Sequence, residues 1–201
     1  GSEMCIRDSE KCAVTDEKVS YSYSELVKLS SSVGTALSEL IVSGDAVGIY
    51  MEKCADAVAA FFATVYAGGF YSVLNTELPQ NRLQTTVSVL NPKVIVTSES
   101  LLETAKEYFS ERKIVTFEDL AKSEPDYAKL GEIRSHKIDT DPLYINFTSG
   151  STGTPKGIVV CHRSVIDFID HFTEIFGIDN NDVIANQAPF DFDVSVKDIY
   201  S

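Results

Sequence analysis

Hydrophobic residues follow two periods along the chain, and stretches of the two kinds alternate. After Ser24, which we predict to cap a helix, leucine and valine recur at spacings of three and four residues. Residues 56–67, 79–90 and 99–109 have the same helical character, whereas the short runs at 47–50, 94–97 and 113–117 are typical of strands. Strands that alternate with helices of this length predict an α/β fold with a largely parallel sheet.

Glycine, asparagine and proline mark where several of these segments end. Gly68 and Gly69 follow the alanine-rich helix of residues 56–67, as glycine commonly does at a helix C-terminus. Asn91 and Pro92 stop the next helix. Residues 121–141 are charged and poor in large apolar side chains, so we expect a long surface connection there.

A stretch of small residues joins two apolar runs, 144–147 and 158–160, and reads Thr-Ser-Gly-Ser-Thr-Gly-Thr-Pro-Lys-Gly. Glycine lets backbone N–H groups approach oxygens, hydroxyls donate hydrogen bonds, and Lys156 adds a positive charge, which together suit a polyphosphate. A flexible linker is the alternative, but linkers rarely join two apolar strands or end in Pro-Lys-Gly. The P-loop of NTPases does not fit, because Pro155 and Gly157 stand where that loop needs glycine and a hydroxyl residue.

Beyond this loop the pattern predicts one more helix and a strand. Ser164, with Asp167 three residues later, forms a capping-box pattern, so we expect the helix to begin there. We expect its apolar face to be buried in the core; it carries Val165, Phe168, Ile169, Phe172, Ile175 and Phe176. Residues 183–185 then read as a short strand.

Composition narrows the classes of function. Hydrophobic residues make up 44% of the chain, which suits a globular core. The net charge of −13 repels phosphate backbones and anionic lipids, so we expect neither nucleic acid nor a membrane as partner. The cysteines and histidines show no zinc-ligand spacing, so we expect no metal site and reduced thiols in the cytoplasm.

The sequence TSGSTGTPKG at residues 148–157 resembles the phosphate-binding signature of the adenylate-forming, or AMP-binding, superfamily, which includes acyl-CoA synthetases, luciferases and nonribosomal peptide synthetase adenylation domains. The resemblance implies the N-terminal portion of that fold's large domain, with mostly parallel sheets flanked by helices. It implies that the loop holds the β- and γ-phosphates of ATP, which brings Mg²⁺, while a carboxylate attacks the α-phosphate. The implied phosphate-binding residues are Thr148, Ser149, Gly150, Ser151, Thr152, Gly153 and Lys156.

Further motifs resemble those of amino-acid adenylation domains. Residues 21–26, YSYSEL, resemble their first core motif, and residues 57–75 resemble the second, which here ends in Tyr-Ser-Val-Leu-Asn where Tyr-Val-Pro-Ile-Asp is usual. Phe-Asp-x-Ser at residues 192–195 resembles the fourth, whose aspartate pairs with the substrate's α-ammonium group. A buried ammonium needs such a counter-charge. Asp193 is therefore the candidate and Asp191 its competitor, and a plain helix cap by Asp193 or Ser195 is the alternative reading.

The string at residues 186–200 is especially similar to D-alanine–D-alanyl carrier protein ligases and stand-alone amino-acid activating enzymes. These couple the adenylate to the phosphopantetheine thiol of a carrier protein, which implies an amino-acid substrate, with D-alanine ranked first, and a carrier partner. An acyl-CoA synthetase is the rival enzyme, because its substrate has no ammonium group and no need of Asp193. A non-catalytic, truncated nucleotide-binding remnant is the alternative from another class.

The two ends of the chain carry further expectations. Residues 1–9 resemble the translation of a sequencing-library adapter, so we expect them to be non-native. Residues 10–201 are then an incomplete N-terminal AMP-binding domain, because the adenine-stacking motif, the ribose-binding aspartate and the C-terminal domain with its catalytic lysine are absent. We accordingly assign no catalytic residue within the chain and expect the piece by itself to be inactive.

Overall fold

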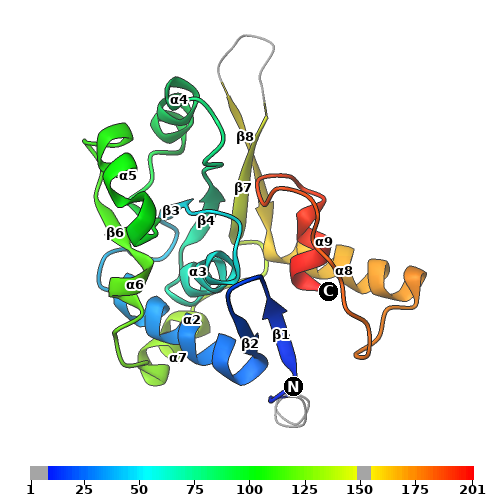
Figure 1. Cartoon of the computed structure of the whole chain (residues 1–201). Coiled ribbons are helices and arrows are strands. Elements are labelled where there is room, and N and C mark those ends of the chain that lie inside the picture. Colours follow the sequence, from blue (N-terminus) through cyan, green and yellow to red (C-terminus); the bar gives the residue numbers. More distant parts are fainter. Residues whose placement is uncertain (1–8, 149–154) are drawn as a thin grey trace.

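A six-stranded sheet forms the centre of the computed structural model, which describes residues 9–148 and 155–201 (Figure 1). Its strands are β3 (Ala46–Tyr50), β4 (Phe70–Val73), β5 (Val94–Thr97), β6 (Ile114–Thr116), β7 (Pro142–Thr148) and β8 (Lys156–Cys161). They lie in the order β6-β5-β3-β4-β7-β8, and every neighbouring pair is parallel except the antiparallel pair β7/β8. The predicted α/β class with a mostly parallel sheet is confirmed.

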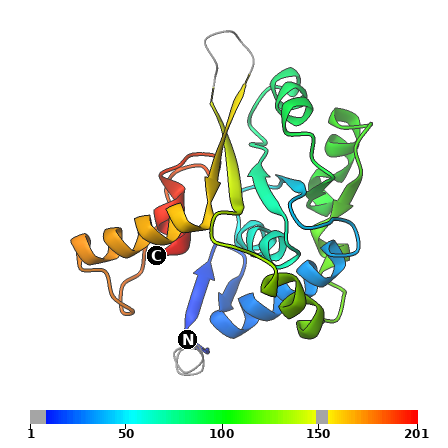
Figure 2. The ribbon, with the colours of Figure 1, turned by 180° about the vertical axis from the view of Figure 1, so that it is seen from behind.

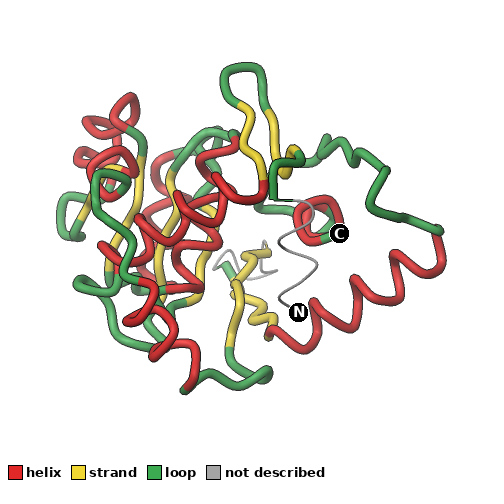
Figure 3. The backbone as a smooth tube through the Cα atoms, turned by 90° about the horizontal axis from the view of Figure 1, so that it is seen from below, coloured by secondary structure: helices red, strands yellow, loops and turns green. Residues whose placement is uncertain are grey.

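Helices cover both faces of the strands (Figure 3). α2 (Tyr23–Leu37) and α3 (Ala55–Tyr66) pack on one face, and α4 (Gln80–Leu90) and α5 (Leu102–Tyr108) pack on the other. In β3, Val47 and Ile49 belong to the first core, while Ala46 and Tyr50 belong to the second. Because both faces of such a strand are buried, its apolar residues run continuously instead of alternating with polar ones.

α2 begins two residues earlier than predicted. Its N-cap is Ser22, not Ser24, because Ser22 and Glu25 satisfy each other's backbone donors. The Glu25 N–H donates to the Ser22 hydroxyl at 3.3 Å, and the Ser22 N–H donates to the Glu25 carboxylate at 2.8 Å. This reciprocal capping box places Ser24 inside the first turn of the helix.

A two-stranded ribbon, β1 (Cys12–Thr15) and β2 (Ser20–Ser22), fixes the start of α3. Asp16, in the turn of the ribbon, accepts a hydrogen bond from the Ala55 N–H at 2.8 Å. This bond, together with those from Val19 and Lys18, lowers the pKa of Asp16. The N-cap residue of α3, Cys54, makes no side-chain cap hydrogen bond, so a carboxylate distant in sequence caps this helix.

The predicted surface connection of residues 121–141 contains a helix instead. α7 (Tyr127–Ser135) follows the short helices η1 (Glu99–Leu101) and α6 (Phe117–Leu120). Asp126 caps it by accepting from the Lys129 N–H at 2.9 Å, and Leu130 is its buried residue. A helix that buries a single side chain leaves no apolar periodicity in the sequence, so the pattern could not predict it.

α8 (His162–Phe176) corrects the predicted start at Ser164. Backbone carbonyls from before β7 satisfy its first donors: the His162 N–H donates to Asp141 at 3.2 Å, and the Arg163 N–H donates to Asp139 at 2.7 Å. A tertiary contact thus fixes the helix start, so the local Ser-x-x-Asp pattern lies inside the helix.

The predictions for the apolar face of α8 and for a strand at residues 183–185 are wrong. α8 extends away from the body of the molecule (Figure 2), and Val165 is its one residue in the buried class. Ile175 is 73% exposed, and the rings of Phe168, Phe172 and Phe176 follow one another along the helix at centroid distances of 6.0 and 4.8 Å. Val183 is 93% exposed and pairs with no described strand. No ladder of backbone hydrogen bonds with a described strand therefore stabilises an extended conformation of this apolar run.

Candidate functional site

The strands β7 and β8 form a hairpin that projects beyond the rest of the sheet (Figure 1). Thr148 ends β7 directly opposite Lys156, the first residue of β8. Both side chains are exposed, and no described residue pairs with the Lys156 ammonium group. The predicted loop residues Ser149, Gly150, Ser151, Thr152 and Gly153 lie outside the described residues, so the structure places the two ends of the predicted phosphate loop.

A glycine at the loop end of this hairpin allows a close approach. A Cβ atom at Gly157 would lie 3.1 Å from the Ile145 Cγ2 atom and 3.3 Å from two ring atoms of Phe147, its cross-strand partner. Separations of this size are tighter than ordinary carbon contacts. The Phe147 ring therefore lies against the Gly157 backbone, next to the pair Thr148 and Lys156.

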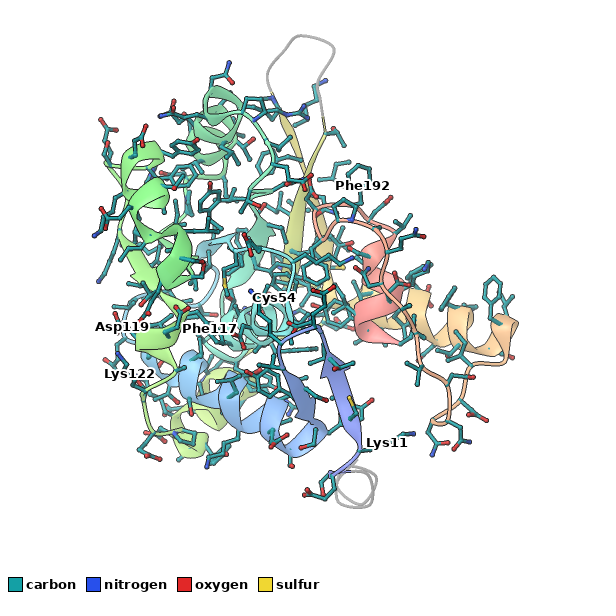
Figure 4. All side chains as sticks on the ribbon, in the orientation of Figure 1. Lys11, Cys54, Phe117, Asp119, Lys122 and Phe192 are labelled. Carbon is teal, nitrogen blue, oxygen red and sulfur yellow. The ribbon has the colours of Figure 1, made fainter. Side chains whose placement is uncertain are left out.

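The second predicted stretch, residues 186–195, runs beside the hairpin before the chain enters α9 (Ser195–Tyr200); Figure 4 labels Phe192 within it. Asp193 is exposed, and its carboxylate makes no hydrogen bond or ion pair with a described residue. Burial raises the pKa of Tyr144 in β7, and the negative charge of Asp193 raises it further, so Asp193 lies near this strand. β7 thus connects the two predicted halves of the site.

The competing aspartate, Asp191, already has a hydrogen-bond partner within the protein. The Asn75 side-chain amide lies 3.2 Å from each of its two carboxylate oxygens. The reading of Asp193 or Ser195 as a helix cap is wrong for α9, whose N-cap residue is Val194 without a side-chain hydrogen bond. The Ser195 hydroxyl instead donates to the Phe192 carbonyl at 2.6 Å, which tightens the turn before the helix.

A cavity of about 450 Å³ lies next to this turn, lined by Ala185, Gln187, Ala188, Val194, Lys197 and Asp198. Its two charged groups are paired with each other, and the Asn186 amide also donates to Asp198 at 2.9 Å. The Asp198 side chain is only 4% exposed. Of the carboxylates in the stretch from 186 to 200, Asp193 is therefore the one without a described partner.

Aromatic side chains form the floor beneath this stretch. Tyr71 of β4 stacks on Phe61 of α3 at 4.5 Å, and Phe190 meets Phe61 edge-on at 5.5 Å. The Tyr71 and Tyr200 hydroxyls lie 2.9 Å apart, and burial raises the pKa of both groups. These contacts hold residues 190 and 200 against the sheet and leave Asp193 at the surface of the turn between them.

Two contacts to this stretch had no counterpart in the sequence analysis. Lys53 and Asn75 reach it from the loops after β3 and β4, more than a hundred positions away in the chain. Residue type and local spacing carry no signal for such contacts. Among residues 9–148 and 155–201, no cluster of histidine, cysteine, aspartate and glutamate could hold a metal ion. No described helix is long and apolar enough to cross a membrane.

Comparison with known proteins finds relatives along nearly the whole chain and solved structures with the same fold. Nonribosomal peptide synthetase 13 of Aspergillus fumigatus is 33% identical over 204 residues, which cover 99% of this chain and 9% of that protein. The nonribosomal peptide synthetase FmoA3, in its α-methyl-L-serine-AMP bound form, superposes with a TM-score of 0.84 at 23% identity, over 98% of this chain and 21% of that one. ATP-bound MatB from Rhodopseudomonas palustris superposes with a TM-score of 0.81 at 23% sequence identity, over 96% of this chain and 41% of that one.

This chain spans less than half the length of each of these proteins. The solved structures support the fold, and the peptide synthetase relative supports adenylation-domain homology along nearly the whole sequence. The model of the AMP-binding enzyme family matches residues 3–201. The chain therefore belongs to the AMP-binding enzymes, as the signature at residues 148–157 implied.

Proposed function

We propose that this chain is the N-terminal part of an enzyme that activates an amino acid with ATP. In that reaction a carboxylate oxygen of the amino acid forms a bond to the α-phosphorus, and the bond between the α-phosphorus and the bridging oxygen breaks. The products are an aminoacyl-adenylate and pyrophosphate. The phosphopantetheine thiol of a carrier protein then loses its proton, its sulfur forms a bond to the carbonyl carbon, and the bond from that carbon to the phosphate oxygen breaks, so that AMP leaves. D-alanine is the first substrate to test.

The observation that carries the proposal is the carboxylate of Asp193, which has no partner among the described residues and lies beside β7, one strand of the hairpin that carries the predicted phosphate loop. Its position suits an α-ammonium group, because a cation leaving water needs an opposite charge that no other group has already neutralised. An amino acid held there would direct its own carboxylate toward nucleotide phosphates held between Thr148 and Lys156. The bound aminoacyl-AMP of FmoA3 and the bound ATP of MatB support both ligands by analogy.

The phosphate half of the site needs positive charge and hydrogen-bond donors. Lys156 supplies the charge without competition from a described carboxylate, and the hydroxyls of Thr148 and the predicted loop residues supply donors. Magnesium enters with ATP and offsets part of the phosphate charge. Stabilising the charge that develops on the phosphates is the largest contribution that such a site makes to the rate.

Amino-acid-dependent exchange of pyrophosphate into ATP tests the proposal, with the complete protein and a panel of amino acids that includes D-alanine. Asp193→Ala should abolish the exchange at every amino-acid concentration used. Asp170→Ala is the matched control, because Asp170 is also exposed but lies on α8. Full exchange by Asp193→Ala would refute the ammonium role. Exchange with simple carboxylic acids alone would favour the acyl-CoA synthetase reading, and nucleotide binding without exchange would favour the remnant.

A further inference from the structure

Two side chains from the carboxyl ends of neighbouring central strands hold the segment that carries Asp193. Lys53 follows β3 and Asn75 follows β4, and these two strands pair in the middle of the sheet. The Lys53 ammonium donates to the backbone carbonyls of Asn186 at 2.7 Å and Ala188 at 3.0 Å. Through these two carbonyls, the Lys53 ammonium group holds the segment against the carboxyl ends of the central strands.

The Asn75 contact has a fixed polarity. Its side-chain oxygen accepts from the Glu77 N–H at 2.9 Å, so its amide nitrogen must face the other way. That nitrogen lies 3.2 Å from both carboxylate oxygens of Asp191. Asparagine can accept on one side and donate on the other, whereas aspartate at this position could only accept. The pair therefore depends on which member carries the charge.

Asp191 is two residues from Asp193, and the backbone between and beyond them is turned tightly. The Phe192 N–H donates to Pro189 at 3.1 Å, and the Val196 N–H donates to the Asp193 carbonyl at 3.1 Å. A tie at Asp191 therefore limits where the Asp193 carboxylate can lie. The charge of Asp191 strengthens the tie, because hydrogen bonds to ionised groups are shorter and stronger than neutral ones.

We propose that Asn75 and Lys53 are positioning residues for amino-acid activation: they set the place of Asp193 relative to the hairpin of β7 and β8. Asn75 holds the segment at Asp191, and Lys53 holds it at the carbonyls of Asn186 and Ala188. This proposal rests on the proposed function, in which Asp193 binds the ammonium group. In this proposal both residues act through the segment of residues 186–195 and not on the reacting atoms. Substituting either residue should therefore raise the KM for the amino acid and leave the KM for ATP, which binds at the other half of the site, nearly unchanged.

Exchanging the charge between the two positions tests the polarity of the pair. Asn75→Asp sets two carboxylates face to face and should raise the KM for the amino acid about tenfold, with the KM for ATP changed less than about twofold. Asp191→Asn should have a smaller effect, because a neutral hydrogen bond can still form. The double variant Asn75→Asp/Asp191→Asn should return the KM to within about threefold of the wild type, because the introduced amide donates to the introduced carboxylate.

An equal rise in both KM values, or a double variant no better than Asn75→Asp, would overturn the positioning role. Lys53 is tested in parallel. Lys53→Met should raise the KM for the amino acid selectively, and Lys53→Arg should restore it, because guanidinium can donate to both carbonyls. An equal rise in the KM for the amino acid in Lys53→Met and Lys53→Arg would overturn the positioning role of Lys53.

The outcome for the contact can be separated from the outcome for the function. If the wild-type protein activates no amino acid, the proposed function fails. Urea unfolding of the wild type, the two single variants and the double variant at Asn75 and Asp191 then still decides the contact. A coupling of about tenfold in the unfolding equilibrium constant supports the tie, and strictly additive effects would overturn it.

Discussion

Replacing Lys156 by alanine should weaken ATP binding by roughly tenfold to a hundredfold without unfolding the protein. Lys156 is exposed at the first position of β8, opposite Thr148, and no described residue competes for its charge. Exposed side chains of this kind contribute within about 0.5 kcal/mol to the free energy of unfolding. The loss should therefore appear in nucleotide affinity and not in stability.

The magnitude follows from the geometry of an exposed cation beside a phosphate. Two unit charges about 4 Å apart attract by about 1 kcal/mol in water and by about 4 kcal/mol near a protein surface. The hairpin projects into solvent, so the value for Lys156 should fall between these limits (Figure 1). An attraction of about 1.4 to 2.8 kcal/mol corresponds to the stated tenfold to hundredfold change in ATP affinity.

Isothermal titration of ATP into the chain, and the KM for ATP in pyrophosphate exchange by the complete protein, measure the effect. Lys156→Arg keeps the charge and should stay within about threefold of the wild type. Lys122→Ala is the matched control, because Lys122 pairs with Asp119 on the side of the molecule away from the hairpin (Figure 4). The gap between Lys156→Ala and the wild type should narrow as salt rises. Unchanged ATP affinity in Lys156→Ala, or an equal loss in Lys122→Ala, would refute the reasoning.

Two further predictions concern stability. Gly34→Ala should destabilise the chain by about 1–2 kcal/mol in urea unfolding, because the added Cβ would lie 3.0 Å from the Ala63 carbonyl oxygen and 3.2 Å from the Tyr66 Cβ, which outweighs the better helix propensity of alanine; a stabilised variant would contradict this. Asp16→Asn should cost about 1 kcal/mol at neutral pH, because Asp16 caps α3 through the Ala55 N–H. Since folding lowers the pKa of Asp16, its contribution is present above the unfolded value of about 4 and is lost as pH falls through the folded value. The unfolding free energies of wild type and variant should converge in acid, and a gap that does not depend on pH would contradict the assignment.

Two central strands, β3 and β5, could be predicted from the sequence because they are buried on both faces. The runs at 47–50 and 94–97 are mostly apolar and match β3 and β5 closely. Asn91 ends α4 in the left-handed conformation at φ 48°, as its place after the last apolar residue indicated. In each of these cases the residue's own chemistry decides the local structure, so a local pattern was sufficient.

Some features could not be predicted because distant parts of the chain decide them. The start of α8 depends on carbonyls of Asp139 and Asp141, and the cap of α3 comes from Asp16. The departure from the usual motif at residues 71–75 could be seen in the sequence, but its meaning could not. The structure shows that Asn75 contacts Asp191, which the sequence motif indicated only as an alternative to Asp193 for binding the substrate's ammonium group.

The ties to Lys53 and Asn75 have a consequence for building chimeric enzymes. A graft that exchanges only residues 186–195 for those of a homologue would place a foreign segment on loops that were fitted to another one. The transferable unit is discontinuous: it comprises this segment and the two side chains that follow β3 and β4. Substrate range in such hybrids should therefore follow the origin of all three pieces together.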